Sequence, residues 1–289
     1  MDRRTDDRLQ PLEGVRVVSL AVNLPGPLAC ARLHALGAEV VKVEPPAGDP
    51  LAAFTRAWYD ELARGQRIVT VDLKTGDGRA ALDAMLAPAD LLVTATRPAA
   101  LGRLGLGWAE LHAHHPRLCH LAIVGHAPPD EERAGHDLTY AAGAGLVDPP
   151  HPPTSLFVDL ASAERAVSDA LALLMARTRD GVGRFASVVL GSIAEELAAP
   201  LRYGLTTADG ILGGSAAFYG LYGAKEGWIA LAALEPAFAR RLAEELGVDA
   251  SDRAALEAAF LSRTADEWEA WARERDLPVA AVRGVSGAR

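Results

Sequence analysis

The segment GVRVVSLAVNLPGPLACARLHALGAEVVKVEPP (residues 14–46) decides the fold class of this chain. Residues 14–20 are short and rich in β-branched side chains, which predicts a strand. After a Pro-Gly-Pro break, residues 28–36 carry apolar side chains at helical spacing and end before Gly37, which suits a helix C-cap. Residues 38–44 predict a second strand. Because strand, helix and strand follow one another within about 30 residues, the segment predicts a right-handed βαβ unit.

The same alternation continues through the first 125 residues. Residues 68–73, 89–94 and 118–124 predict further strands, and residues 78–86 predict a helix between them. The expected fold class is therefore α/β, with a Rossmann-like, doubly wound parallel sheet. Ligands of such sheets bind at the carboxyl ends of the strands.

The middle of the chain changes character. Residues 127–159 contain several prolines and predict a long loop, which in a compact domain is usually functional. Residues 160–177 predict an amphipathic helix, and a second helical stretch is expected over about 187–201.

The last part of the chain predicts a smaller α+β domain. Two apolar runs around a Gly-closed loop, within residues 218–232, predict a β-hairpin. Three helices are expected after it, the last begun by a Thr264–Glu267 capping box; these helices span residues 236–246, 251–261 and 265–275. We expect a large domain over residues 10–204 and a small domain over 205–289.

Composition excludes several classes of protein. The 289 residues are 50% hydrophobic and 23% charged, which rules out a disordered chain. The formal net charge of −9 argues against a nucleic-acid partner. Only Cys30 and Cys119 occur, so neither a disulfide framework nor a thiolate metal cage is expected. Without a signal-peptide pattern or a bilayer-length apolar stretch, we expect a cytoplasmic protein with no membrane partner.

Two tempting ligand sites are weak at the level of sequence. Glu44 follows the second strand, where a ribose-binding acid of a dinucleotide site would lie, but the preceding loop offers Gly26 alone between two prolines. A histidine-rich stretch suggests a metal site, but the neighbours His114 and His115 cannot both face one ion from a regular element. We therefore expect neither NAD nor a bound metal.

Three acid–base side chains are unremarkable when each is taken alone. His136 lies in the long loop, where most histidines have a structural hydrogen bond. Asp159 directly precedes the predicted helix and suits an ordinary N-cap. Glu235 precedes Pro236 and suits a helix-start carboxylate.

Motifs over nearly the whole chain nevertheless resemble the family III CoA-transferases (the CaiB/BaiF type), and within them most closely the α-methylacyl-CoA racemases. The matching segments are residues 12–18, 26–27, 36–46, 48–50, 71–74, 97–98, 103–107, 116–118, 135–137, 159, 218–222 and 233–238. This resemblance implies a Rossmann-like large domain, a smaller second domain, and an interlocked homodimer that binds an acyl-CoA thioester.

The resemblance also implies roles for the acid–base residues. An aspartate matching Asp159 is the nucleophile of the transferases and an acid/base of the racemases. The racemases add a histidine matching His136, supported by a glutamate matching Glu235. We expect no separate cofactor, because CoA enters as part of the substrate. Candidate partners for its phosphates are Lys42, Arg64, Arg67, Arg97 and Arg103.

Some positions depart from the family pattern. Thr139 replaces the usual asparagine after the histidine motif, and Ser187 stands where an aspartate is common. The chain also ends shortly after residues 277–279, about where the family returns to the large domain. We therefore expect that return to be short or missing, which weakens the inference of CoA binding more than that of the acid–base groups.

The leading hypothesis is a 2-methylacyl-CoA racemase that transfers protons through a thioester enolate, with His136 and Asp159 on opposite faces of the substrate and about 6–7 Å apart. A CoA-transferase with Asp159 as nucleophile, a repurposed scaffold that only binds, and another enolate reaction such as a lyase or cyclisation step all remain open. A helix N-terminus lowers the pKa of a carboxyl group and burial raises it, so the pKa of Asp159 cannot be assigned from the sequence.

Overall fold

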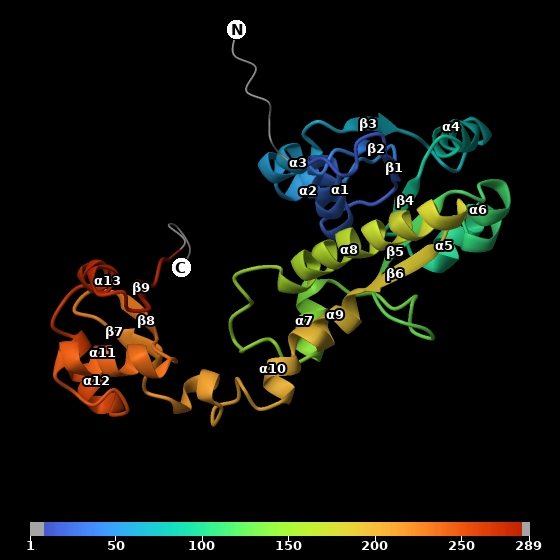
Figure 1. Cartoon of the computed structure of the whole chain (residues 1–289). Coiled ribbons are helices and arrows are strands. Elements are labelled where there is room, and N and C mark those ends of the chain that lie inside the picture. Colours follow the sequence, from blue (N-terminus) through green and yellow to red (C-terminus); the bar gives the residue numbers. More distant parts are fainter. Residues whose placement is uncertain (1–8, 285–289) are drawn as a thin grey trace, which may run out of the picture. The chain divides into compact units, whose positions relative to one another are not determined.

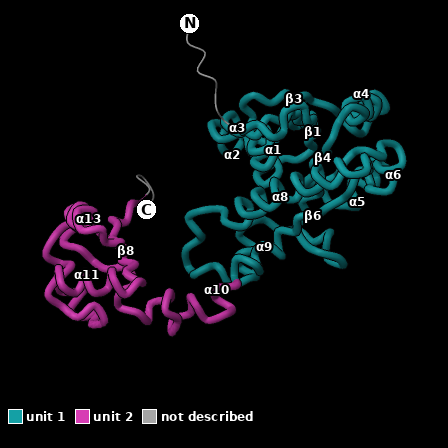
Figure 2. The backbone as a smooth tube through the Cα atoms, in the orientation of Figure 1, with its two compact units in different colours: residues 1–198 teal, residues 199–289 magenta. Residues whose placement is uncertain are grey.

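A computed structural model describes residues 9–284 and divides the chain into two compact units (Figure 2). Unit 1 comprises residues 1–198 and unit 2 comprises residues 199–289. The division falls between Ala198 and Ala199, whereas the sequence predicted it after residue 204.

Unit 1 is built on one six-stranded sheet. Its strands are β1 (Arg16–Ser19), β2 (Glu39–Glu44), β3 (Arg67–Thr70), β4 (Leu91–Thr94), β5 (Cys119–Val124) and β6 (Phe185–Val189). They lie in the order β3-β2-β1-β4-β5-β6, and all neighbouring pairs are parallel. This is the strand order of a doubly wound dinucleotide-type fold. The predicted α/β class with a parallel sheet is confirmed.

Helices cover both faces of this sheet (Figure 1). Those of unit 1 are α1 (Pro25–Ala35), α2 (Pro50–Phe54), α3 (Arg56–Ala63), α4 (Gly76–Leu86), α5 (Pro98–Arg103), α6 (Trp108–His114), α7 (Asp137–Gly143), α8 (Phe157–Asp180) and α9 (Leu190–Leu197). Successive strand residues point to opposite faces. Val17 and Val93 join a core with residues of α1 and α8, whereas Val18 and Leu92 join a core with residues of α4 and α6.

Two sequence predictions in the middle of unit 1 were wrong. The segment 127–159 is not all loop, because it contains α7 and the start of α8. The stretch 187–201, predicted to be helical, begins with the end of β6. The backbone of β6 pairs with β5 along Phe185–Val189, and its β-branched residues suit this pairing. Pairing with the distant strand β5 thus makes residues 187–189 a strand, although their local sequence pattern resembles that of the helix α9 that follows.

Unit 2 carries a second, antiparallel sheet of β7 (Tyr219–Gly223), β8 (Trp228–Ala232) and β9 (Val279–Ala281), in the order β7-β8-β9. Its helices are α10 (Ala199–Arg202), a π-helical turn (Ile211–Ser215), α11 (Pro236–Leu246), α12 (Arg253–Phe260) and α13 (Ala265–Glu274). The predicted hairpin and its three following helices are confirmed, and β9 was not predicted.

The core of unit 2 is aromatic. Tyr222, Phe260, Trp268 and Trp271 are buried, and the Trp268 ring stands edge-on to both Phe260 and Trp271, with centroids 5.2 and 5.0 Å away. The Trp268 indole donates a hydrogen bond to the Phe260 carbonyl at 2.7 Å. The unit therefore has a core of its own. Within residues 9–284, no helix is both long and apolar enough to cross a bilayer.

Candidate functional site

A cavity of about 260 Å³ opens at the carboxyl ends of β1, β4 and β5 and is called cavity A here. Its walls include Asn23 after β1, Arg97 after β4, and Gly125 after β5. His136 and Asp159 both line it. The structure thus brings together two of the three predicted acid–base residues. They are 23 positions apart in the sequence and lie at the starts of two different helices, α7 and α8.

His136 is held by backbone hydrogen bonds that leave its ring free. It is the N-cap of α7, where its amide donates to the Thr139 hydroxyl at 2.9 Å and its carbonyl accepts from the same hydroxyl at 2.8 Å. The imidazole itself has no hydrogen-bond partner among the described residues of unit 1. Thr139, which departs from the family pattern, therefore fixes the backbone at the catalytic candidate and leaves its ring available to a substrate.

Asp159 lies in the first turn of α8, and not at the N-cap, because the helix begins at Phe157. Its amide donates to the buried carboxylate of Asp137 at 2.9 Å. Burial and, to a smaller extent, the nearby negative charge of Asp137 together raise the pKa of Asp159 to about 7. The desolvation of this carboxyl group therefore outweighs the favourable field of the helix N-terminus.

Sequence reasoning missed Tyr140, a buried residue whose side chain lines cavity A. The pKa of Tyr140 is raised by burial and then by the charge of Asp159, and is lowered by Arg97. A Cβ on Gly125 would lie 2.4 Å from the Tyr140 hydroxyl, and one on Gly135 would lie 2.5 Å from its ring. The two glycines thus form the slot for this ring. The spacing of four from His136 along α7 could have pointed to it.

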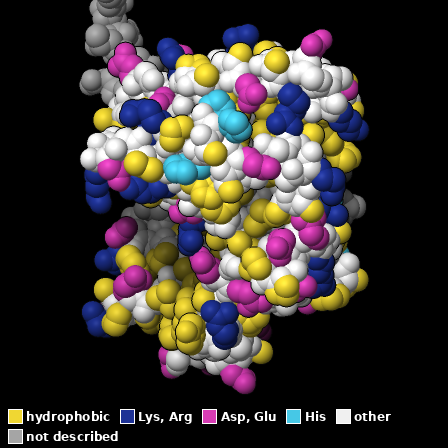
Figure 3. Space-filling view, turned by 90° about the vertical axis from the view of Figure 1, so that its right-hand side faces the viewer, with side chains coloured by type: hydrophobic (Ala, Val, Ile, Leu, Met, Phe, Trp, Pro, Cys, Tyr) yellow, Lys and Arg dark blue, Asp and Glu magenta, His cyan; other side chains and the backbone are white. Residues whose placement is uncertain are grey.

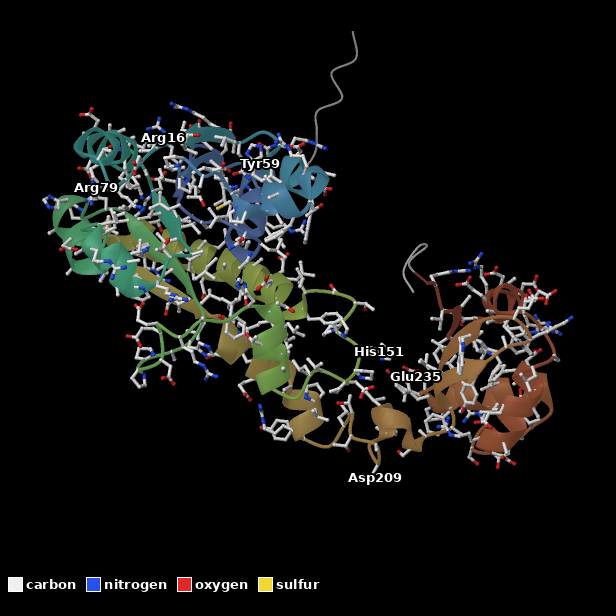
Figure 4. The ribbon with its side chains drawn as sticks, turned by 180° about the vertical axis from the view of Figure 1, so that it is seen from behind. Arg16, Tyr59, Arg79, His151, Asp209 and Glu235 are labelled. Carbon is white, nitrogen blue, oxygen red and sulfur yellow. The ribbon has the colours of Figure 1, made fainter. Side chains whose placement is uncertain are left out.

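Lys42, a predicted phosphate partner, is buried in an ion-pair cluster at the end of β2. Its ammonium lies 2.8 Å from a Glu44 carboxylate oxygen and 2.5 Å from an Asp49 oxygen. Tyr59, on α3 and labelled in Figure 4, donates to Glu44 at 2.8 Å, while Asp49 accepts from the amides of Asn23 and Leu51 at 2.9 Å. A phosphate would have to displace these carboxylates to reach the ammonium.

The four predicted arginines are exposed. Arg97 lines cavity A, at the N-cap of α5. Arg64 follows α3, Arg67 begins β3 and Arg103 ends α5. Their contacts with phosphate remain predictions.

Glu235 belongs to unit 2. It is exposed and is the N-cap of α11, where its side chain makes no capping hydrogen bond (Figure 4). Its predicted support of His136 therefore remains a prediction.

Two further cavities adjoin cavity A. Cavity B, of about 510 Å³, lies at the carboxyl ends of β1, β2 and β4 and is largely apolar, with Glu44, Asp72 and Lys74 among its lining residues. Cavity C, of about 220 Å³, lies between the β5–β6 edge and α5–α6, and Trp108, Phe185 and Ser187 line it. Thr96, just after β4, lines all three cavities.

Lys74 is a second residue that sequence reasoning missed. Its side chain is exposed and lines cavity B. It ends the family-like segment 71–74, so the motif itself carried the signal.

Histidine side chains gather on the face of unit 1 shown in Figure 3. Helix α6 and its C-cap contribute His112, His114 and His115. Among residues 9–284, however, no group of three His, Cys, Asp or Glu side chains is arranged to hold a metal ion. His120 and Cys119 succeed one another on β5 and are both buried.

Comparison with known proteins places this geometry in a family. The model of "CoA-transferase family III" matches residues 12–289. The α-methylacyl-CoA racemase of Mus musculus is 32% identical over 259 residues, which cover 83% of this chain and 66% of that protein. The succinyl-CoA–D-citramalate CoA-transferase of Chloroflexus aurantiacus is 34% identical over 196 residues, which cover 62% of this chain and 49% of that enzyme.

The solved structures agree. A hypothetical protein of Mycobacterium tuberculosis superposes with a TM-score of 0.83 at 30% identity, covering 95% of this chain and 85% of that one. A CaiB/BaiF family protein of Brucella suis shares the fold, with a TM-score of 0.81 at 24% identity, covering 96% and 85%. The chain spans about half to two thirds of the length of the curated relatives quoted above. On the match over residues 12–289, this chain belongs to CoA-transferase family III.

Proposed function

We propose that this protein is a racemase of 2-methylacyl-CoA thioesters, in which His136 and Asp159 transfer the proton at C2. The observation that carries the proposal is that both side chains line cavity A. A carboxyl group with a pKa of about 7 is half ionised at neutral pH, so Asp159 is suited to act as a base in one direction and as an acid in the other.

The proposed reaction has two balanced steps. One of the two residues removes the C2 proton, and the electron pair of the C–H bond moves onto the thioester carbonyl to form an enolate. The other residue then delivers a proton to the opposite face of C2, and the carbonyl is restored. Hydrogen-bond donors that line cavity A, such as the Tyr140 hydroxyl and the Arg97 guanidinium, are available to the enolate oxygen.

In this proposal the nucleotide end of CoA occupies cavity B. The apolar walls of that cavity suit a purine ring, and the exposed Lys74, which lines it, suits a phosphate. Arg103 directly precedes Leu104, another lining residue, and is a further candidate. The substrate then passes Thr96 to reach cavity A. No further cofactor is needed, because CoA enters as part of the substrate.

The deciding experiment is proton exchange. A single-enantiomer 2-methylacyl-CoA incubated in heavy water with the protein should gain deuterium at C2 and lose optical purity. The matched variants His136→Gln and Asp159→Asn should each lose this exchange while they still bind CoA by calorimetry. No deuterium in any member of a panel of such thioesters would reject the proposal.

A CoA-transferase is the second candidate, favoured by the 34% identity to a CoA-transferase of Chloroflexus aurantiacus. Asp159 would then attack the thioester carbonyl, expel CoA as a thiolate and form a mixed anhydride. The transferase requires a second carboxylic acid and forms an enzyme adduct that hydroxylamine traps in the wild type and not in Asp159→Asn. Exchange at C2 without an acid acceptor would distinguish the racemase.

The interlocked homodimer expected from the resemblance belongs to this proposal as well. Light scattering should give a particle of twice the 30.4 kDa chain mass. A particle of single-chain mass at micromolar concentration would refute the dimer. It would not contradict the proposed proton exchange.

A further inference from the structure

The start of α5 needs a hydrogen-bond acceptor that its own N-cap does not provide. Helices commonly begin at Ser, Thr, Asp or Asn, whose side chain accepts a hydrogen bond from an amide of the first turn. The N-cap of α5 is Arg97, and a guanidinium group donates hydrogen bonds but accepts none. The side chain of Arg97 therefore leaves the first turn of α5 uncapped and lines cavity A instead.

The amides of this first turn can be accounted for one by one. Pro98 has no amide hydrogen. The amides of residues 100 and 101 donate to the Arg97 carbonyl, at 2.9 and 3.1 Å. The remaining amide, that of Ala99, donates to the Glu132 carboxylate at 2.7 Å. The acceptor that α5 lacks thus comes from a residue that is 33 positions further along the chain.

Glu132 belongs to the loop between β5 and α7, which forms much of the wall of cavity A. Residues 131 and 133–135 line this cavity, and His136 follows them directly. The backbone hydrogen bonds of the loop close local turns within residues 127–133. Among residues 9–284, the bond from Glu132 to α5 is the one hydrogen bond that joins residues 126–135 to another element. The position of the loop therefore depends on this bond.

The hydrogen bond between Glu132 and Ala99 ties together two segments that carry groups of the proposed reaction. One end of the bond is two residues from Arg97, and the other end is four residues from His136. The charge of Arg97 also lowers the pKa of Tyr140, so its guanidinium acts on a hydroxyl in the wall of cavity A. Because a carboxylate accepts the bond, it is charge-assisted, which makes it stronger than a bond between neutral groups.

We propose that Glu132 is a positioning residue, which holds Arg97 at a fixed place relative to His136 through its hydrogen bond to the start of α5. This inference rests on the proposed function, because it presumes that the Arg97 guanidinium donates to the enolate oxygen. A displacement of about 1 Å at a reacting centre can lower a rate about 10²-fold. A single bond between two walls of the cavity is therefore sufficient to affect the rate of C2 exchange.

The first test compares three variants with the single-enantiomer 2-methylacyl-CoA that the wild type exchanges fastest. Glu132→Ala removes the acceptor, and Glu132→Gln retains an oxygen atom without the charge. Glu110→Ala is the matched control, because Glu110 accepts from the Gly107 amide at 3.2 Å at the start of α6 and does not line cavity A. We expect kcat of Glu132→Ala to fall about tenfold, with KM changed less than about threefold. Glu132→Gln should recover most of the lost rate, and Glu110→Ala should keep the wild-type rate.

A double-mutant cycle shows whether Glu132 acts through Arg97. Arg97→Ala removes the proposed donor to the enolate oxygen, so the place of that donor no longer affects the rate. In this background, Glu132→Ala should lower kcat by less than about twofold, because the two residues act as one unit. A loss of about tenfold in both backgrounds would make the two effects independent and would overturn the positioning role.

Trypsin tests the bond between the loop and α5 without any substrate. Arg133 is exposed and lies next to Glu132, and trypsin cleaves the chain after it when the loop opens locally. Cleavage after Arg133, followed by mass spectrometry, should be about tenfold faster in Glu132→Ala than in the wild type and unchanged in Glu110→Ala. Equal cleavage rates in all three proteins would show that Glu132 does not hold the loop, and would overturn the inference.

The outcomes separate this inference from the proposed function. If the wild type exchanges C2 protons and Glu132→Ala does so with the same kcat, the role of Glu132 is wrong and the proposed function stands. If the wild type binds no CoA and exchanges no thioester, the proposed function is rejected together with the positioning role. The trypsin measurement then still decides whether Glu132 holds the loop to α5.

Discussion

Two groups of carboxylates lie near the carboxyl ends of neighbouring strands and differ in what surrounds them. At β2, Glu44 and Asp49 share the ammonium of Lys42 and accept further hydrogen bonds. In cavity A, Asp159 has no cationic partner within hydrogen-bond distance among residues 9–284, and burial and then the like charge of Asp137 raise its pKa. The first group therefore has a shared cation and hydrogen bonds within the protein, whereas Asp159 is left poised to change its protonation state.

The contrast shows that burial alone does not mark a functional carboxylate. Asp49 is more deeply buried than Asp159, yet its carboxylate lies 2.5 Å from the Lys42 ammonium and accepts two backbone hydrogen bonds. Paired charges hold a loop to a strand, and an unbalanced one is available to a substrate. The same surroundings that make Asp159 costly to ionise give it the pKa that acid–base chemistry at neutral pH requires.

The largest expected effect is on activity, and it tests whether the unpaired carboxylate of cavity A transfers protons. Asp159→Asn should reduce C2 exchange by about 10²–10⁴-fold, because it removes one of the two proton-transfer groups. Deuterium incorporation followed by mass spectrometry measures the loss. Asp169→Asn, the same change further along α8 and outside cavity A, is the matched control and should retain the wild-type rate. Equal rates for both variants would contradict the role of Asp159.

The second effect is on the free energy of unfolding, and it tests whether the carboxylates at β2 have a structural role. Lys42→Met should lower the free energy of unfolding by about 3–5 kcal/mol, because it leaves Glu44 and Asp49 as buried, unpaired charges. Urea denaturation measures the change. The control is Arg56→Met, which breaks an exposed pair with Asp60 and should cost about 1 kcal/mol or less. Similar losses of unfolding free energy in both variants would contradict the structural role of the ion pairs of Lys42.

The third effect depends on pH. The pKa of Asp159 is about 7 in the folded chain and about 3.9 when unfolded, so the folded chain holds an extra proton between these values and loses stability as the pH rises through them. Asparagine does not ionise. Relative to wild type, Asp159→Asn should therefore gain roughly 1–3 kcal/mol of unfolding free energy between pH 4 and pH 8. A difference that stays constant over this pH range would refute the raised pKa.

The smallest effect concerns the ring beside Asp159. Gly135→Ala would place a Cβ 2.5 Å from the Tyr140 ring, so the ring must shift in the wall of cavity A, and C2 exchange should fall about tenfold. Gly143→Ala, at the end of the helix that carries Tyr140 and with open space around its Cβ, should leave the rate unchanged. Rates and thermal stability of both variants can be measured side by side. Loss of activity in Gly143→Ala alone would reverse this interpretation.

Much of the fold could be predicted because the relevant patterns are short. The first βαβ unit, the 218–232 hairpin and the Thr264–Glu267 capping box are formed by residues within about 30 positions of one another, and all are confirmed. The last strand of each sheet in chain order, β6 and β9, was not predicted. Both β6 and β9 depend on partners far away in the chain, β5 and β8, so local periodicity did not identify them.

The candidate site was predictable in part. The resemblance singled out His136 and Asp159, and the structure brings both to cavity A. Tyr140 was missed, because its place depends on the slot between Gly125 and Gly135, which exists only once the loop after β5 returns along α7. Lys42 was predicted to be a phosphate partner, because nothing in the local sequence indicates that Asp49 folds back onto it.

By itself, the sequence of this protein determined the alternation of strands and helices, the family, and the identity of the two acid–base candidates. The alternation follows from residue types and short spacings, and the family and the two candidates follow from motifs that resemble those of a known family. Only the tertiary structure decided the strand order, the pairing of Lys42, the raised pKa of Asp159 and the presence of three adjoining cavities around Thr96. The reason is physical: burial and charge pairing depend on which distant segments meet, and they change the free energy of an ionised group by several kcal/mol.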